Sequence, residues 1–246
     1  MKSKKIIVLT IFLICFFINT YSLMVLDEDD FKKDVEIAVK KILRLSDTHE
    51  VRFCFPEIST YNIVSGYIPF IKMSTGSLRL NDLWTDKVYF EFYNVKLDTE
   101  ILHNEKRLVA DPRMKIRLYA EISEKAINNL LYKKRKKIKV KDPEALLRDG
   151  FIILKGHVKA MFVSSYIRAK GYFYIENGKQ INFASNYIAL NKIKLPKFLL
   201  VRIINTINPV LDMNELDFDI KLRDIILKDR KVVITSFPDG FSGEEL

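Results

Sequence analysis

The fold of this chain is decided by residues 151–188, which read FIILKGHVKAMFVSSYIRAKGYFYIENGKQINFASNYI. Apolar and polar side chains alternate through most of this stretch, as they do in half-buried β-strands. The pair Asn177–Gly178 is typical of a tight hairpin turn, because both residue types accept a positive φ. The stretch therefore predicts a meander of at least three antiparallel strands with one dry face and one wet face.

The predicted dry face is shallow where its residues are small. Gly156 and Ala160 fall on one strand of the meander, and Ala169, Gly171 and then Phe173 fall on the next. Small side chains let another group approach a sheet closely. Two occupants fit this pattern: a helix of the same chain, which small residues commonly accommodate, or an apolar ligand. In the second case these five residues line the ligand cavity.

Two amphipathic helices are predicted before the meander. The first follows Asp27 and carries an apolar stripe from Phe31 to Leu43 at helical spacing. Ser123 caps the second, whose stripe ends near Leu131. Alternation predicts further strands over residues 61–97, 114–122, 216–222 and 225–234.

A third helix is predicted after the meander, beginning at Pro196 and ending before Pro209. It is apolar around most of its circumference, which predicts that it is buried or lines an apolar cavity. Phe198, Leu199 and Ile203 are its candidate cavity residues.

Together these elements predict an α+β fold in which a long, curved antiparallel sheet packs around amphipathic helices. No break in composition marks a linker. We therefore expect one domain over residues 23–238, followed by a flexible tail over residues 239–246.

The N-terminus has the order of a secretory signal. Three lysines within the first five residues precede an apolar run from Ile6 to Ile18, and polar residues follow up to Ser22. The run is shorter than the about 20 apolar residues that span a bilayer. Residues 1–22 are predicted to be a signal peptide, and the mature protein is expected to be periplasmic or extracellular. An uncleaved anchor that keeps the protein at the membrane is the alternative.

The chain is basic, with a formal net charge of +10. Five cations are consecutive in sequence: Lys133, Lys134, Arg135, Lys136 and Lys137. One interpretation is a solvated helix end, where basic residues suit the helix dipole. The other is contact with anionic lipid headgroups, worth about 1 kcal/mol for each cation near such a membrane. An exported basic protein favours an anionic membrane surface over nucleic acid as its partner.

No catalytic or metal-binding motif is present in the sequence. It has neither a glycine-rich phosphate loop nor a GxSxG stretch, and His49, His103 and His157 are far apart. Cys54, the one cysteine beyond the apolar N-terminal run, is expected to be a small buried hydrophobe. We expect a non-enzyme without cofactor or metal. An envelope hydrolase is the remotest alternative.

Several stretches occur in an order that resembles a known family. Asp149–Gly150 leads a strand, and Ile207 to Asp212 follow the apolar helix. With AEISE at 120–124 and IENG at 175–178, this order makes the chain similar, from about Asp27 to Ser236, to the LmeA-like phospholipid-binding proteins. That family was long catalogued as a domain of unknown function. The Asn-Pro-x-Leu-Asp pattern is the most specific element of the likeness.

The chain departs from the family pattern in two places. Arg230 stands in the last turn, where Gly is expected, and the lysine-rich stretch at 133–141 resembles an insertion. The resemblance implies an extracytoplasmic lipid-binding protein of envelope maintenance, with a sheet wrapped around helices as in tubular lipid-binding proteins. The family offers no catalytic residues.

Two functions therefore compete. The first is binding of a phospholipid or similar amphiphile in an apolar cavity between helices and sheet. The second is a non-catalytic envelope adaptor or structural module that docks a partner protein or anionic polymer through its basic face. The lipid, the oligomeric state and any protein partner stay open.

Overall fold

The computed structural model describes residues 27–46, 50–80, 82–109, 111, 113–160, 163–191, 193–194, 201, 204–205, 207–215 and 219–237. In this part of the chain four α-helices form: α2 (Glu28–Ile42), α3 (Thr60–Ser65), α4 (Thr99–Glu105) and α5 (Glu124–Ile138). A short 3-10 helix, η1, spans Met213–Glu215. The strands are β1 (Val51–Cys54), β2 (Tyr67–Thr75), β3 (Arg79–Leu80), β4 (Leu83–Trp84), β5 (Lys87–Lys96), β6 (Lys115–Ser123), β7 (Val140–Arg148), β8 (Phe151–Ala160), β9 (Val163–Glu176), β10 (Gln180–Leu190), β11 (Ile193–Lys194), β12 (Leu211–Asp212), β13 (Asp224–Lys228) and β14 (Lys231–Thr235).

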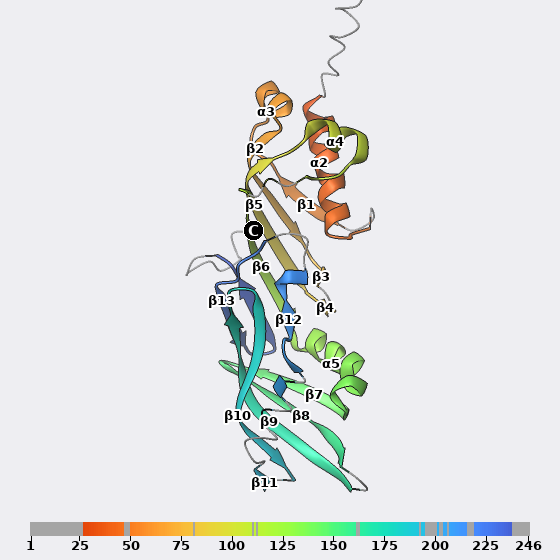
Figure 1. Cartoon of the computed structure of the whole chain (residues 1–246), viewed down its shortest axis with the longest axis vertical. Coiled ribbons are helices and arrows are strands. Elements are labelled where there is room, and N and C mark those ends of the chain that lie inside the picture. Colours follow the sequence, from red (N-terminus) through yellow and green to blue (C-terminus); the bar gives the residue numbers. More distant parts are fainter. Residues whose placement is uncertain are drawn as a thin grey trace, which may run out of the picture.

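The strands form two large sheets, one after the other along an elongated molecule (Figure 1). The first sheet has the order β1-β2-β5-β6-β14-β13, and the second has the order β11-β10-β9-β8-β7 with β12 added to β10. Strands β3 and β4 make a separate hairpin. Every pairing between these strands is antiparallel, which confirms the predicted α+β class.

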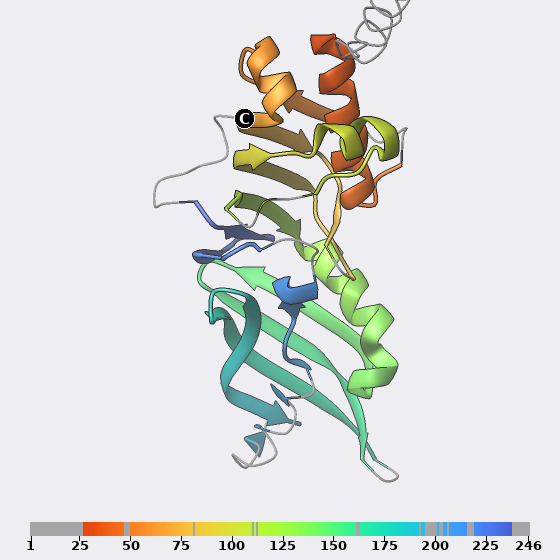
Figure 2. The ribbon, with the colours of Figure 1, turned by 45° about the horizontal axis from the view of Figure 1, so that its top comes forward.

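Helices α2, α3 and α4 gather at the far end of the first sheet (Figure 2). Helix α2 buries Phe31, Val35 and Val39, whose spacing of four places them on one face. Asp34 is also buried there, and His103 Nδ1 of α4 lies 3.0 Å from its carboxylate. Lys106, just after α4, forms a salt bridge with the same carboxylate. Apolar contacts and one buried charge cluster thus hold α2 against α4.

The first sheet is covered on both faces. The alternation of apolar and polar residues in β5 had predicted one exposed face. Tyr89 and Glu91 of β5 are buried. The Tyr89 hydroxyl donates to Glu91 at 2.8 Å, and Lys72 Nζ lies 3.5 Å from the same carboxylate. The ring of Phe237 packs 5.8 Å from that of Tyr89. Burial, and then the hydrogen bond to Glu91, raise the pKa of Tyr89. The C-terminal segment therefore completes a second, smaller core.

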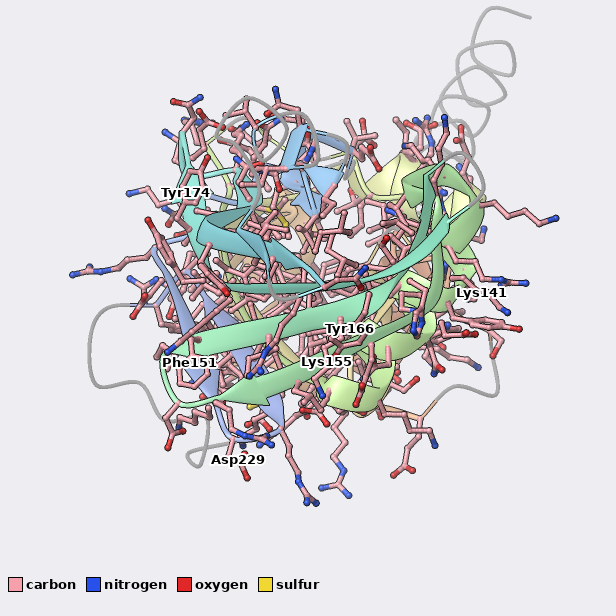
Figure 3. The ribbon with its side chains drawn as sticks, turned by 90° about the horizontal axis from the view of Figure 1, so that it is seen from below. Lys141, Phe151, Lys155, Tyr166, Tyr174 and Asp229 are labelled. Atoms are coloured by element: carbon pink, nitrogen blue, oxygen red, sulfur yellow. The ribbon has the colours of Figure 1, made fainter. Side chains whose placement is uncertain are left out.

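The second sheet curls strongly into a half-barrel. Figure 3 shows this sheet from below, with side chains packed inside its curve. Ile152 pairs with Gly171 and Leu154 pairs with Ala169, so these residues share one face as predicted. The tight turn between β9 and β10 has φ values of 54° at Asn177 and 68° at Gly178. The predicted meander, its dry face and its hairpin are confirmed.

One apolar core cluster includes residues of both sheets. The sheets are also joined by backbone at the turn between β7 and β8. There the Gly150 N–H donates to the Leu227 carbonyl at 3.1 Å, and the Asp229 N–H donates to the Asp149 carboxylate at 3.0 Å. The turn is thereby fixed to the β13–β14 hairpin.

Several local predictions are wrong. Residues 60–65 form α3 instead of a strand. The strand expected over residues 216–222 is not present in its described part, where Ile220 makes only an isolated bridge to Ile116. Cys54 is exposed, because the alternation of β1 turns Phe53 inward instead. The predicted signal peptide (1–22) and tail (239–246) lie outside the described residues.

Candidate functional site

The open edge of the curled sheet at β7 is covered by α5. Ser123 caps the helix by accepting a hydrogen bond from the Ala126 N–H, as predicted. Asn128 then forms two hydrogen bonds with β7, receiving the Ala145 N–H at 2.7 Å and donating to the Ala145 carbonyl at 2.9 Å. The Leu147 N–H donates to Glu124 at 2.6 Å. These bonds fix the first half of α5, so the position of its second half is also set.

The opposite part of the sheet, at β10, is covered by residues 208–215, which follow the predicted third helix. These residues are called the closing segment below. The Asn208 side chain accepts from the Phe183 N–H at 2.8 Å and donates to the Phe183 carbonyl at 3.0 Å. The Val210 N–H donates to the Ile181 carbonyl at 2.8 Å. Asn208, the Asn of the Asn-Pro-x-Leu-Asp pattern, therefore holds this segment against β10 through two hydrogen bonds.

Two small apolar cavities lie between α5, the curled sheet and this segment. Each has a volume of about 50 Å³. Leu131 of α5, Leu154 of β8, Phe183 of β10 and Ile207 line both. The first cavity also reaches the other sheet at Val232 of β14. The cavities therefore lie where helix, both sheets and the closing segment meet.

A larger hollow of about 490 Å³ opens beside them. Leu131 and Ile207 line it as well as both small cavities, so the three spaces are neighbours. Its wall is partly charged. Lys133, Lys134 and Lys137 of α5, together with Asp82, Asp212 and Glu215, are among its lining residues.

Asp212 is engaged by its own segment. It accepts from the Asn214 N–H at 2.9 Å and from Gln180 Nε2 at 2.7 Å. The Asn214 N–H, and then the Gln180 side chain, hold the pKa of the Asp212 carboxyl below its ordinary value. The carboxylate is therefore ionised at neutral pH and fixes the start of η1.

The residues predicted on the dry face have three different outcomes. Ala169 lines one small cavity and Phe173 lines the other. Gly156 and Gly171 line neither of these cavities nor the hollow. The structure describes the backbone of Ala160, which pairs with Val163, but not its side chain.

The two glycines have a different explanation from the predicted one. A Cβ at Gly171 would overlap the carbonyl oxygen of Ala184 and the ring of Phe183 on β10. A Cβ at Gly156 would overlap the side chain of Val140 on β7. The close approach at both glycines is therefore made by neighbouring strands of the same curled sheet.

Of the predicted third helix, the structure describes only Val201, Ile204, Asn205 and Ile207. Phe198, Leu199 and Ile203 lie outside the described residues. Ile204 is half-buried against the core, and Ile207 lines all three spaces. Ile207 belongs to the apolar helix that was predicted to be buried or to line a cavity, but it was not among the named cavity candidates. Leu131 was predicted to lie in the apolar stripe of the second helix, but the stripe does not distinguish it from its neighbours as a cavity residue.

All five cations lie on α5, but their side chains have different surroundings. Lys133, Lys134 and Lys137 face the large hollow. The Arg135 guanidinium stacks 3.8 Å from the ring centre of Tyr132, and Lys136 is exposed. The run thus lies in the last turns of α5, as the helix-end interpretation predicts, and three of its cations also line the large hollow.

No family model, curated protein or solved structure matches this chain. Among the described residues, no helix has the length and apolar character needed to cross a membrane. The same residues contain no cluster of three His, Cys, Asp or Glu side chains arranged to hold a metal ion.

Proposed function

We propose that this protein binds a phospholipid or a similar amphiphile between α5 and the curled sheet, outside the cytoplasmic membrane, as part of envelope maintenance. The observation that carries the proposal is the group of three neighbouring spaces that share Leu131 and Ile207. Two of them are lined almost wholly by apolar side chains, as a binding site for an acyl chain requires. The likeness of the sequence to LmeA-like proteins supports the same assignment.

The volumes limit how the amphiphile fits. Each small cavity, at about 50 Å³, is smaller than the roughly 150 Å³ cavity that accepts benzene in an engineered protein. The small cavities therefore take only the end of a chain, and the larger hollow takes the rest. Each buried methylene contributes about 0.8 kcal/mol, so the affinity is expected to rise with chain length.

Native mass spectrometry tests this proposal. The protein is purified without detergent from its own envelope fraction, and bound molecules are released by collision and identified after solvent extraction. The proposal predicts a reproducible bound amphiphile at one copy per chain. Protein that carries no such molecule, and takes up none from phospholipid vesicles, would contradict it.

The adaptor function stays a second candidate because of the outer face of the curled sheet. Tyr172 and Tyr174 of β9 and Tyr187 of β10 are exposed there, next to the basic residues Arg168 and Lys170. Tyr174 is labelled in Figure 3. Tyrosine and basic side chains together are enriched at protein interfaces and at membrane interfaces.

The two candidates respond differently to changes on this face. Replacing the three tyrosines by serine is expected to abolish docking to a partner or an anionic polymer if the adaptor function holds. Under the lipid-binding proposal the same variant keeps its bound amphiphile, because none of the three residues lines the described spaces.

A further inference from the structure

The spacing of the cations on α5 separates those that face the hollow from those that do not. Lys133, Lys134 and Lys137 follow Leu130 at positions three, four and seven, which lie on one face of a helix. All four residues line the large hollow. Because Asn128 fixes the helix to β7, this face is held toward the hollow.

The hollow combines an apolar floor with a charged rim. Its apolar lining includes Leu83, Leu130, Leu131, Ile138, Ile207, Val210 and Leu211. The lysines stand on the α5 side, and Asp212 and Glu215 come from the segment that closes the sheet. An amphiphile placed here has its chain against the floor and its polar end at the rim.

The lysines on the α5 side of the hollow are only partly neutralised by salt bridges. Lys134 Nζ lies 3.7 Å from Asp82, whose carboxylate also lies 3.2 Å from Arg79. Lys133 and Lys137 make no salt bridge with any other residue in the described part of the chain. They are one helical turn apart, where like charges repel. An anion bound between them would relieve this repulsion.

We propose that Lys133, Lys134 and Lys137 bind the phosphate group of a phospholipid whose acyl chain enters the small apolar cavities. This inference rests on the proposed function and adds the chemistry of the head group. It assigns the three lysines a part in selecting the lipid, beyond any attraction of the protein to an anionic surface. Lysine ammonium groups are common phosphate ligands, and their bonds to an anion are stronger than neutral ones.

The test uses lipids with six-carbon chains at concentrations below micelle formation, so no membrane surface is present. The probes are dihexanoyl phosphatidic acid, dihexanoylglycerol, which lacks the phosphate, and inorganic phosphate. Binding is measured by calorimetry on the full chain. The wild-type protein is expected to bind the phosphatidic acid at least about tenfold more tightly than the other two probes, as expected for a hydrogen bond to a charged group.

Two triple variants make the comparison specific. In the first, Lys133, Lys134 and Lys137 are changed to Gln, and the affinity for phosphatidic acid is expected to fall about tenfold while that for dihexanoylglycerol stays the same. In the control, Lys125, Lys136 and Lys139, which are exposed and line none of the described spaces, are changed to Gln. The control loses the same charge and is expected to change neither affinity.

The outcomes separate this inference from the proposed function. Equal binding of both lipids, unchanged in the first variant, overturns the phosphate site and leaves lipid binding intact. Inorganic phosphate bound as tightly as phosphatidic acid also overturns it, since the site is then an anion site without a lipid. Binding of neither lipid contradicts the proposed function itself. If the triple variant melts early, the double variant Lys133→Gln/Lys137→Gln, which breaks no described salt bridge, replaces it.

Discussion

Gly171 illustrates how closely two strands of the second sheet approach each other. It pairs with Ile152 on one side and with Ser185 on the other, next to a register shift between Ser185 and Tyr187. The backbone of β10 approaches it so closely that even a methyl group has no room. Glycine is used in strands where another backbone comes this near.

Replacing Gly171 by Ala is expected to lower the free energy of unfolding by about 1–3 kcal/mol, because the added methyl overpacks the sheet. Urea denaturation measures the change. Gly76→Ala is the matched control: the nearest atom to its Cβ position is 4.0 Å away, and the expected change is within about 0.5 kcal/mol. Equal effects of the two substitutions would show that the close approach at Gly171 carries no cost.

Arg230 is the other residue at which the backbone explains the sequence. Its φ is +62°, a left-handed conformation that glycine adopts without strain. A glycine in this turn would therefore adopt the same backbone conformation without strain.

Arg230→Gly is expected to raise the free energy of unfolding by about 0.5–1 kcal/mol, after the entropy cost of glycine is subtracted. Lys228→Gly, in the preceding strand β13, removes the same charge without such strain, and is expected to destabilise by about 0.5–1 kcal/mol. Thermal melts of the two variants should therefore shift in opposite directions. A lower melting temperature for Arg230→Gly would refute this explanation.

At the level of elements, the sequence patterns predicted those strands whose faces differ in polarity. Lys115–Ser123 alternates clearly and forms β6, and the meander likewise forms β8, β9 and β10. Strand β7 contains Pro143 and several charges, so it lacks alternation and was not predicted. The preceding helix α5 includes the cation run, as the helix-end interpretation predicts, because lysine and arginine are good helix formers.

The candidate site was harder to predict than the strands, because it is formed by residues distant in sequence. Ala169 and Phe173 were predicted from the dry face, but Leu131 and Ile207 become cavity residues only when α5 and the closing segment fold over the sheet. The small size of Gly171 indicated a close neighbour correctly. Only the register with β10 identifies that neighbour as another strand.

The closing segment depends on Asn208, and the next prediction tests that dependence. Asn208→Ala removes two hydrogen bonds to the backbone of Phe183 and leaves those backbone groups unpaired. We expect a loss of about 1–3 kcal/mol in the free energy of unfolding. Faster hydrogen exchange at the Phe183 and Val210 amides should accompany it.

Asn205→Ala serves as the control for this segment. Asn205 is exposed and lies one helical turn earlier, so its replacement is expected to change the stability by less than about 0.5 kcal/mol. If Asn208→Ala is as mild as Asn205→Ala, the segment is held by its apolar side chains alone.

At the level of the whole molecule, two sheets share one apolar core. The first sheet is buried on both faces: one face belongs to the main apolar core, and Tyr89, Tyr119 and Val233 pack with Phe237 in a smaller core on the other. The curled sheet retains apolar spaces where α5 and the closing segment cover it. The proposed binding function therefore belongs to the junction of the two sheets, where α5 and the closing segment meet β14 of the first sheet.

Leu131 is the residue at which the central claim is most directly tested, because it lines both small cavities and the hollow. Leu131→Trp places a larger apolar side chain in the shared space. Tyr132→Trp is the matched control, since Tyr132 is the next residue of α5 and is exposed. Overpacking costs typically about 1–3 kcal/mol, so melting of the ligand-free proteins establishes that both variants are folded.

The measurement is uptake of a fluorescent phospholipid from vesicles by the two folded variants and the wild-type protein. The account predicts that Leu131→Trp weakens uptake at least about tenfold, a loss of about 1.4 kcal/mol, and that Tyr132→Trp takes up lipid as the wild type does. Uptake by Leu131→Trp equal to that of the wild type would contradict a lipid site between α5 and the curled sheet.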